Sequence, residues 1–266
     1  MKKKKALSTV LKVISLCVWV FSVVIVAQLV VGFIMLSLLG KAQFSTPLWT
    51  SIYSAVVYLL ALFVTIFVPI AMKNRQKKGK KVEKEKEKKK DDYVSPAELK
   101  KDLGTVGLPT WTDVGLAPVG FIISLLLAAV LVSFFNLFPW FDAEQAQDVG
   151  YSVYIPGFGR ILAFFTLVVV APIAEEIIFR GWLYTKLRET FNKKVSDGYG
   201  IVLSSLIVSA LFGLIHLQWN VGVNVFALSI VLCALREITG TIYAGILTHM
   251  LKNGVAFYLL YVVGVV

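Results

Sequence analysis

The stretch ILAFFTLVVVAPIAEEIIFRGWLY, residues 161–184, is long and apolar enough to cross a lipid bilayer. Near its middle it carries three ionisable side chains, Glu175, Glu176 and Arg180. Each charge at the centre of a bilayer costs roughly 2.5–3.5 kcal/mol on insertion scales, and folding alone does not require two adjacent carboxylates there. The stretch therefore predicts both a transmembrane helix and a functional site inside it.

Apolar runs of similar length recur along the whole chain. Hydrophobic residues make up 58% of its 266 residues, whereas soluble domains typically contain about 45–50%. Only helices and closed barrels satisfy their backbone hydrogen bonds within a membrane, and these run lengths fit helices. We expect an all-α, polytopic membrane protein with about seven transmembrane helices, at roughly residues 11–39, 48–72, 116–138, 161–184, 201–218, 221–235 and 241–263.

The net charge of +11 comes mostly from two basic blocks beside apolar runs, Lys2–Lys5 and Lys73–Lys101. Cytoplasmic flanks of membrane helices are rich in Lys and Arg. With the N-terminus in the cytoplasm, the external segments carry only Lys41 and Arg160 as basic residues. This predicts a multi-pass cell-membrane protein with a cytoplasmic N-terminus and an extracytoplasmic C-terminus. The basic blocks then indicate orientation and contact with anionic lipids at the Lys-rich linker, and we expect no nucleic-acid partner.

The segment KKGKKVEKEKEKKKDD, residues 77–92, contains no aromatic residue and cannot bury a core. It predicts a basic, disordered cytoplasmic linker over residues 73–107, although its near-alternating charges also fit an extended helix. The linker divides a two-helix transmembrane hairpin, residues 1–72, from a five-helix unit, residues 108–266. We expect the chemistry in the five-helix unit.

The chain has two histidines, His216 and His249, and both lie inside or at the end of apolar runs. A single membrane histidine more often joins helices by a hydrogen bond, but two of them accompanied by a buried glutamate pair indicate a catalytic site. In an antiparallel helical hairpin, residues equidistant from the turn share one depth. The midpoint between Glu175 and His216 falls at residues 195–196, within a polar turn. We expect His249 at about the same level.

Spacing along each helix suggests different roles for these side chains. Glu176 and Arg180 are four residues apart and can form an ion pair, while Glu175 is rotated by about 100° toward a water-filled cavity. His249 and Asn253 are also four apart and share a helix face. Peptide hydrolysis needs such parts: a carboxylate base, an imidazole and donors for an oxyanion.

Three motifs carry a resemblance to a known family. EEIIFR at 175–180 has the form EExxxR, FGLIH at 212–216 the form FxxxH, and HMLKN at 249–253 the form HxxxN. In this order, on consecutive apolar runs, they resemble the CPBP intramembrane proteases. That family includes the type II CAAX prenyl endopeptidases, their bacterial members and bacteriocin-processing or immunity proteins. The resemblance covers about residues 160–255.

The resemblance implies a CAAX-protease-like helical core and an intramembrane glutamate endopeptidase, of a family long called metalloproteases. We expect no cofactor. In such an enzyme Glu175 and His216 would activate water, and His249 and Asn253 would form the oxyanion site. Three further residues would be structural or would position the substrate, namely Glu176, Arg180 and Phe212. The substrate would be a membrane-associated peptide or protein, such as a leader peptide, a pheromone or bacteriocin precursor, or a CAAX-like C-terminus. Because Glu175 lies closer to the cytoplasmic boundary than to the outer one near Arg160, we expect it to enter from the cytoplasmic side.

Other interpretations stay open at this point. Glu175, His216 and His249 are possible zinc ligands, since zinc takes nitrogen and oxygen ligands, but no HExxH motif is present and we favour metal-free chemistry. Buried Glu and His side chains can also form the proton relay of a transporter, although the paired repeats of many transporters are missing. A non-catalytic immunity scaffold is a third reading. Lys252 fits no motif: it can pair with a glutamate, reach the cavity or snorkel toward an interface.

Overall fold

The computed structural model describes residues 2–83, 95–143, 151, 155, 157–192 and 194–264, with the backbone alone at 2–5 and 73–83. Every regular element in these residues is helical. Seven of the described helices have the length and apolar composition to cross a membrane: Ala6–Phe44, Pro47–Met72, Trp111–Phe135, Gly157–Phe191, Asp197–Ile215, Trp219–Thr239 and Tyr243–Val263. The prediction of an all-α, polytopic membrane protein is confirmed.

The first four helices cover the hairpin, the linker and the next span. They are α1 (Lys2–Phe44), α2 (Pro47–Glu83), α3 (Pro96–Leu103) and α4 (Trp111–Phe135). The remaining elements are α5 (Gly157–Phe164), η1 (Phe165–Val170), α6 (Ala171–Glu176), η2 (Ile177–Leu183), α7 (Tyr184–Phe191), α8 (Asp197–Ile215), α9 (Trp219–Thr239), α10 (Tyr243–Tyr258) and η3 (Leu259–Val263). The α7–α8 connection coincides with the turn predicted around residues 195–196.

The span that carries the glutamates is a continuous helical path from α5 to α7, interrupted by two wider π-helical stretches, η1 and η2. Short π stretches inside α-helices are frequent at functional sites. Pro172 follows η1 closely and has no backbone N–H, so it cannot continue the hydrogen-bond ladder of the preceding turn. The sequence predicted an ordinary helix here, and the structure adds these two local widenings.

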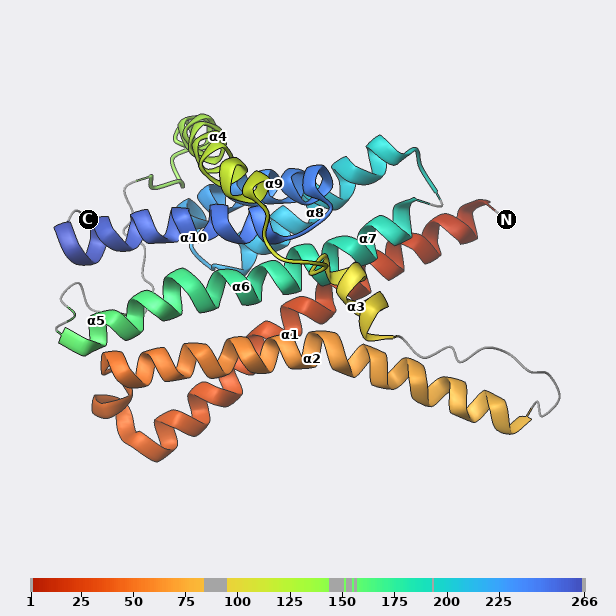
Figure 1. Cartoon of the computed structure of the whole chain (residues 1–266), viewed down its shortest axis with the longest axis horizontal. Helices are drawn as coiled ribbons and strands as arrows, with labels where there is room; N and C mark the ends of the chain where they lie inside the picture. Colours follow the sequence, from red (N-terminus) through yellow and green to blue (C-terminus); the bar gives the residue numbers. More distant parts are fainter. Residues whose placement is uncertain are drawn as a thin grey trace.

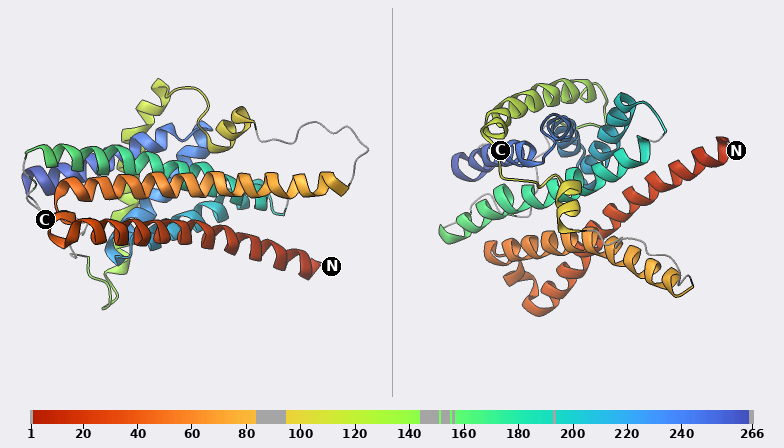
Figure 2. Two further views of the ribbon diagram at one scale, coloured as in Figure 1. Left: turned by 90° about the horizontal axis from the view of Figure 1, so that it is seen from below. Right: turned by 45° about the vertical axis from the view of Figure 1, so that its right-hand side comes forward.

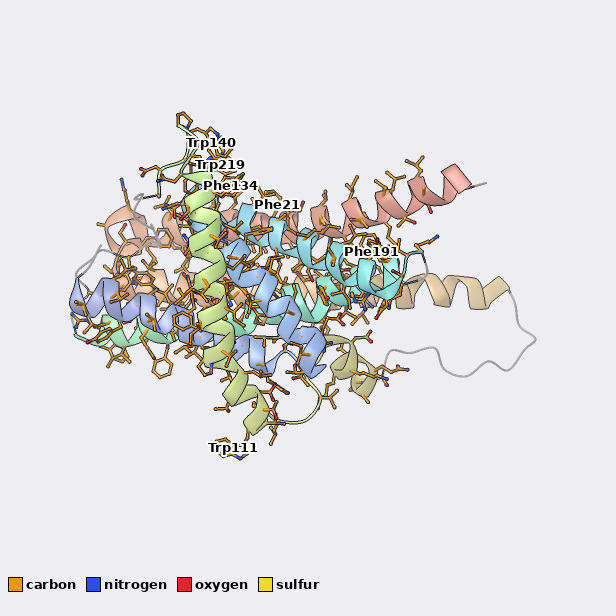
Figure 3. All side chains as sticks on the ribbon, turned by 90° about the horizontal axis from the view of Figure 1, so that it is seen from above. Phe21, Trp111, Phe134, Trp140, Phe191 and Trp219 are labelled. Atoms are coloured by element: carbon orange, nitrogen blue, oxygen red, sulfur yellow. The ribbon has the colours of Figure 1, made fainter. Side chains whose placement is uncertain are left out.

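Several of the helices run along the long direction of the molecule, and α4 crosses this direction (Figures 1 and 3). The N-terminus and the C-terminal ends of α2 and α7 lie at one end, while the C-terminus and the α1–α2 turn lie at the other (Figures 1 and 2).

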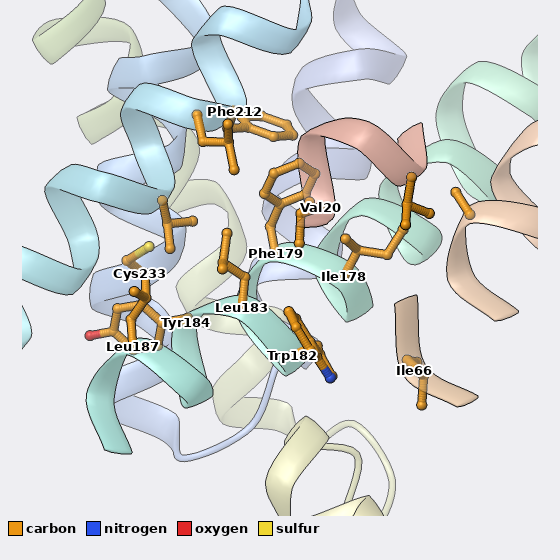
Figure 4. Packing of buried hydrophobic residues seen from close by; sticks show 14 of the residues in the cluster. Val20, Ile66, Ile178, Phe179, Trp182, Leu183, Tyr184, Leu187, Phe212 and Cys233 are labelled. Carbon is orange, nitrogen blue, oxygen red and sulfur yellow. The ribbon is translucent and has the colours of Figure 1, made fainter. Parts of the chain in front are cut away.

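The hairpin and the C-terminal helices share one hydrophobic core. Val20 of α1 and Ile66 of α2 belong to the same buried cluster as Ile178, Phe179 and Phe212 (Figure 4). The rings of Phe179 and Phe212 meet edge to face with centroids 4.9 Å apart. The division between hairpin and five-helix unit seen in the sequence is therefore not a division of the packed core.

The expected disordered linker, residues 73–107, contains helical structure at both ends, which corrects that expectation. α2 continues to Glu83, and α3 occupies Pro96–Leu103. A reciprocal cap starts α3: Ser95 Oγ accepts a hydrogen bond from the Glu98 backbone, and the Glu98 carboxylate accepts one from the Ser95 backbone. Leu103 is buried against η2, which fixes the helix on the core. The rest of the predicted linker, residues 84–94, lies outside the described residues.

α4 lies across α9 and α10, with Trp111 at one end and Trp140 near the other (Figure 3). Trp140 meets Trp219 with ring centroids 5.9 Å apart, and Trp111 is exposed. An apolar pocket of about 620 Å³ lies beside the Trp140–Trp219 contact, between α4, α8 and α9.

Candidate active site

A cavity of about 320 Å³ lies between the hairpin and the C-terminal helices. Its lining includes all four side chains that the resemblance marks as catalytic, Glu175, His216, His249 and Asn253. These residues come from α6, the end of α8 and α10, so the fold brings together three separate parts of the sequence. The hairpin supplies the opposite wall.

Glu175 is the carboxylate that faces this cavity. Its side chain is 15% exposed, so water can reach it. One oxygen, Oε1, accepts a hydrogen bond from the hydroxyl of Tyr58 at 2.8 Å. The other, Oε2, lies 3.7 Å from Nε2 of His249, which is too far for a direct hydrogen bond. Glu175 is thus held in place on one side and open to a small molecule on the other.

Glu176 has opposite surroundings. It forms the predicted ion pair with Arg180, with Oε1 2.8 Å from Nη1, and both side chains are fully buried. The Arg180 guanidinium also lies over the ring of Phe212, 4.6 Å from its centroid. Gly245 on α10 leaves room for this carboxylate, because a Cβ there would stand 3.2 Å from Oε2 of Glu176. This pair is part of the core, and it neutralises its own charge.

His249 connects the two glutamates. Its Nδ1 lies 3.1 Å from Oε1 of Glu176, and its Nε2 faces Oε2 of Glu175. An ionised carboxylate can only accept a hydrogen bond, so Nδ1 carries the proton in the contact with Glu176. The ring is then fixed by the buried pair, while Nε2 is presented at the cavity.

His216 ends α8 and has its own anchor. Nδ1 lies 2.7 Å from the carbonyl oxygen of Phe212, which only accepts, so Nδ1 donates and Nε2 is left with a lone pair. His216 lies within electrostatic range of Glu175 and His249. Leu217 follows at φ 56, a left-handed conformation that turns the chain directly after the histidine.

Phe212 packs at the centre of this group. Its ring meets the ring of His216 at 5.0 Å and that of His249 at 5.9 Å, both edge to face. One residue further along α8, Gly213 approaches the α9 backbone so closely that a Cβ would lie 2.8 Å from the carbonyl oxygen of Gly222. Small residues allow such close helix contacts in membranes. Packing therefore fixes the end of α8, and with it His216.

Asn253 contacts the backbone as well as the cavity. Its Nδ2 donates to the carbonyl oxygen of Leu167 at 2.9 Å. In the π-helical turn of η1 that carbonyl would accept from residue 172, which is a proline without an N–H. Asn253 thus replaces the missing backbone donor and ties α10 to the helix of Glu175. Because Nδ2 carries two hydrogens, this bond uses one of them.

The contacts of the three proposed zinc ligands use only one atom of each side chain. The Nδ1 atoms of His216 and His249 meet Phe212 and Glu176, and Oε1 of Glu175 accepts a hydrogen bond from Tyr58. These contacts use neither the Nε2 atoms nor Oε2 of Glu175, and a zinc-ligating histidine commonly has its other ring nitrogen anchored in this way. In the part of the chain that the structure describes, no three His, Cys, Asp or Glu side chains converge as a metal cluster. Metal-free chemistry stays the prediction, with zinc as its alternative.

Sequence reasoning missed the contribution of the hairpin. Tyr58 contacts Glu175 directly, and Gln28, Tyr53 and Ser54 also line the cavity. The available signal was a cluster of polar side chains in an otherwise apolar run, with Tyr58 four residues after Ser54 on one helix face. Lys252, which no motif explained, lines the same cavity.

Residues 157–255 match a family model described as type II CAAX prenyl endopeptidase, Rce1-like. This region is similar to the CAAX protease family. The match runs from α5 to α10, contains the four cavity residues named by the motifs, and confirms the resemblance drawn over residues 160–255. It covers a little over a third of the chain, and the hairpin with Tyr58 lies outside it. No curated protein and no solved structure matched the chain.

Proposed function

We propose that this protein is an intramembrane endopeptidase that uses Glu175 to activate a water molecule. The observation that carries the proposal is the contrast between two adjacent carboxylates. Glu176 is fully buried and neutralised by Arg180, whereas Glu175 is open to a cavity that both histidines share. A carboxylate left open beside two imidazoles in an intramembrane cavity has no structural purpose that the contacts reveal.

In the proposed reaction, a water bound at Glu175 gives its proton to the free carboxylate oxygen, and its hydroxide attacks the carbonyl carbon of the peptide bond. The lone pair on Nε2 of His216 orients the same water. The oxyanion that forms is stabilised from the α10 side by the remaining amide hydrogen of Asn253 and by His249, which fills this role with a proton on Nε2 in addition to the one on Nδ1. The C–N bond then breaks, and the proton held by Glu175 passes to the leaving amine.

Tyr58 acts through Glu175 and is a positioning residue. Its hydroxyl occupies Oε1 and so directs Oε2 toward the cavity. A carboxylate that rotated freely would bring the wrong oxygen, or neither, to the water. The hairpin thereby takes part in the proposed chemistry through Tyr58.

The proposed substrate is a membrane-associated peptide or protein whose chain extends into the cavity. A leader peptide, a pheromone or bacteriocin precursor and a CAAX-like C-terminus all fit this description. With the N-terminus in the cytoplasm, as the basic flanks favour, the substrate enters from the cytoplasmic side.

The test is cleavage of a membrane-tethered reporter peptide by the purified protein in liposomes. Glu175→Gln and His216→Ala should each lower kcat by about 10²–10⁴-fold, the range typical of a general acid–base group. Glu189→Gln is a matched control, since Glu189 is exposed and pairs with Lys186 near a helix end. Cleavage at the wild-type rate in Glu175→Gln would remove the catalytic assignment. A cellular phenotype that persists in this variant would favour the scaffold reading.

A further inference from the structure

Lys252 is the one Lys or Arg among the described residues that line the catalytic cavity. It lies on α10, three residues after His249 and directly before Asn253. Three residues of helix rise by about 4.5 Å, so its backbone lies close to the proposed reaction centre. The cavity wall therefore carries one carboxylate, Glu175, and one ammonium group, Lys252.

The contacts of Lys252 do not explain its presence as a structural residue. An ion pair requires a carboxylate oxygen within 4.0 Å of the ammonium nitrogen. In the described part of the chain, no carboxylate oxygen lies that close to the ammonium nitrogen of Lys252. Glu176 is neutralised by Arg180, and Glu175 is bonded to Tyr58, although it is near enough to interact with Lys252 electrostatically. Extension of the Lys252 side chain to a membrane interface does not explain it either, because Lys252 lies in the middle of α10 and lines the cavity.

We propose that Lys252 binds a carboxylate of the substrate peptide close to the scissile bond. This inference rests on the proposed protease function and adds a specificity to it. An ammonium group in a confined cavity, where the effective dielectric constant is lower than in bulk water, attracts an anion more strongly than it would in water, and the anionic groups of an unmodified peptide are carboxylates. Lys252 would also repel a free N-terminal ammonium group, so a chain end bound here is the C-terminus.

Two sources can supply this carboxylate. One is the α-carboxylate of a substrate cut within a few residues of its C-terminus. The other is an Asp or Glu side chain beside the cleaved bond. Both present the same chemistry to Lys252, and substrate pairs distinguish them.

The first experiment compares matched reporter peptides. One pair differs only in a C-terminal carboxylate or carboxamide, and a second pair, amidated at the C-terminus, differs in Asp or Asn near the cleaved bond. We expect the wild-type protein to prefer one acidic member by about 10–100-fold in kcat/KM, which identifies the source. Lys252→Gln should abolish that preference through KM with kcat retained, and Lys252→Arg should keep part of it. Lys194→Gln, at an exposed site in the α7–α8 turn, is the matched control.

Equal cleavage of both members in both pairs by the wild-type protein would overturn the proposal. So would a uniform loss of kcat on all substrates in Lys252→Gln, which would assign Lys252 to the electrostatics of Glu175. Binding of fluorescent, uncleaved acid and amide peptides to the Glu175→Gln protein separates this proposal from the protease assignment. Acid-selective binding that Lys252→Gln removes supports Lys252 even if no peptide is cut; binding without selectivity contradicts it even if cleavage occurs.

Discussion

Glu175 and Glu176 are neighbours in sequence, yet the regions around their carboxylates differ in almost every respect. The cavity side offers Glu175 a tyrosine hydroxyl, solvent access and two imidazole rings. The buried side gives Glu176 a guanidinium, a histidine nitrogen and no exposure at all. The comparison shows that one turn of helix can hold one carboxylate in a buried ion pair and leave its neighbour open to a cavity. His249, which meets both regions, couples the rigidity of the buried pair to the geometry of the cavity.

The sharpest way to break this comparison is to remove the partner of Glu176. Arg180→Ala would leave a buried, unpaired carboxylate, at a cost of about 3–5 kcal/mol in the free energy of unfolding. We expect a large drop in yield and in thermal stability of the purified protein. Glu175→Gln should unfold at the wild-type temperature, and equal stability of the two variants would show that the two carboxylates do not differ as described.

A smaller effect is expected on the cavity side. Tyr58→Phe removes a hydrogen bond to a charged group, so the proposed proteolytic kcat should fall by roughly 10-fold while stability changes little. Tyr53→Phe is the control, because Tyr53 lines the same cavity but donates to the backbone of Gln28 at 3.3 Å. The same kcat in both variants would mean that Tyr58 does not position Glu175.

The fit of α10 against Glu176 can be tested with two glycines on one helix. Gly245→Ala places a Cβ 3.2 Å from Oε2 of Glu176, and that oxygen cannot move freely because Arg180 and His249 hold the carboxylate. We expect a loss of about 1 kcal/mol in stability, the lower end of overpacking costs. Gly254→Ala meets only Val168, at 3.6 Å, and should be neutral or slightly stabilising in chemical denaturation. A Gly245→Ala protein as stable as Gly254→Ala would indicate a looser site.

The smallest expected effect is that of a chelator. If Glu175 activates water without a metal, exhaustive chelation should leave the cleavage rate unchanged, as measured on the tethered reporter. Loss of activity that added zinc restores would move Glu175, His216 and His249 to the role of ligands.

Much of the membrane fold was predictable because a bilayer imposes strict lengths on apolar runs. The i, i+4 spacing likewise predicted the Glu176–Arg180 pair, and the polar turn after α7 predicted how α8 folds back. The docking of the hairpin was not predictable, because lipid-facing and protein-facing surfaces of a membrane helix are both apolar. Hydrophobic periodicity therefore could not show that Tyr58 meets Glu175.

Two other departures have local causes. The capping box at Ser95–Glu98 is a sequence signal for the start of α3. The prediction of a disordered linker rested on the highly charged composition of the segment and did not use this signal. For Asn253, the i, i+4 spacing predicted the helix face but not the hydrogen bond to the carbonyl oxygen of Leu167. That carbonyl is available because Pro172 has no N–H to donate to it in the π-helical turn of η1.

The contact between Tyr58 and Glu175 also bears on how the protein is made. Chains fold progressively from the N-terminus during synthesis, so α1 and α2 enter the membrane before the glutamate-bearing span leaves the ribosome. A hydroxyl donor is then already present in the bilayer when Glu175 arrives. We expect the hairpin to lower the energetic barrier to inserting a charged helix, in addition to forming a wall of the finished cavity.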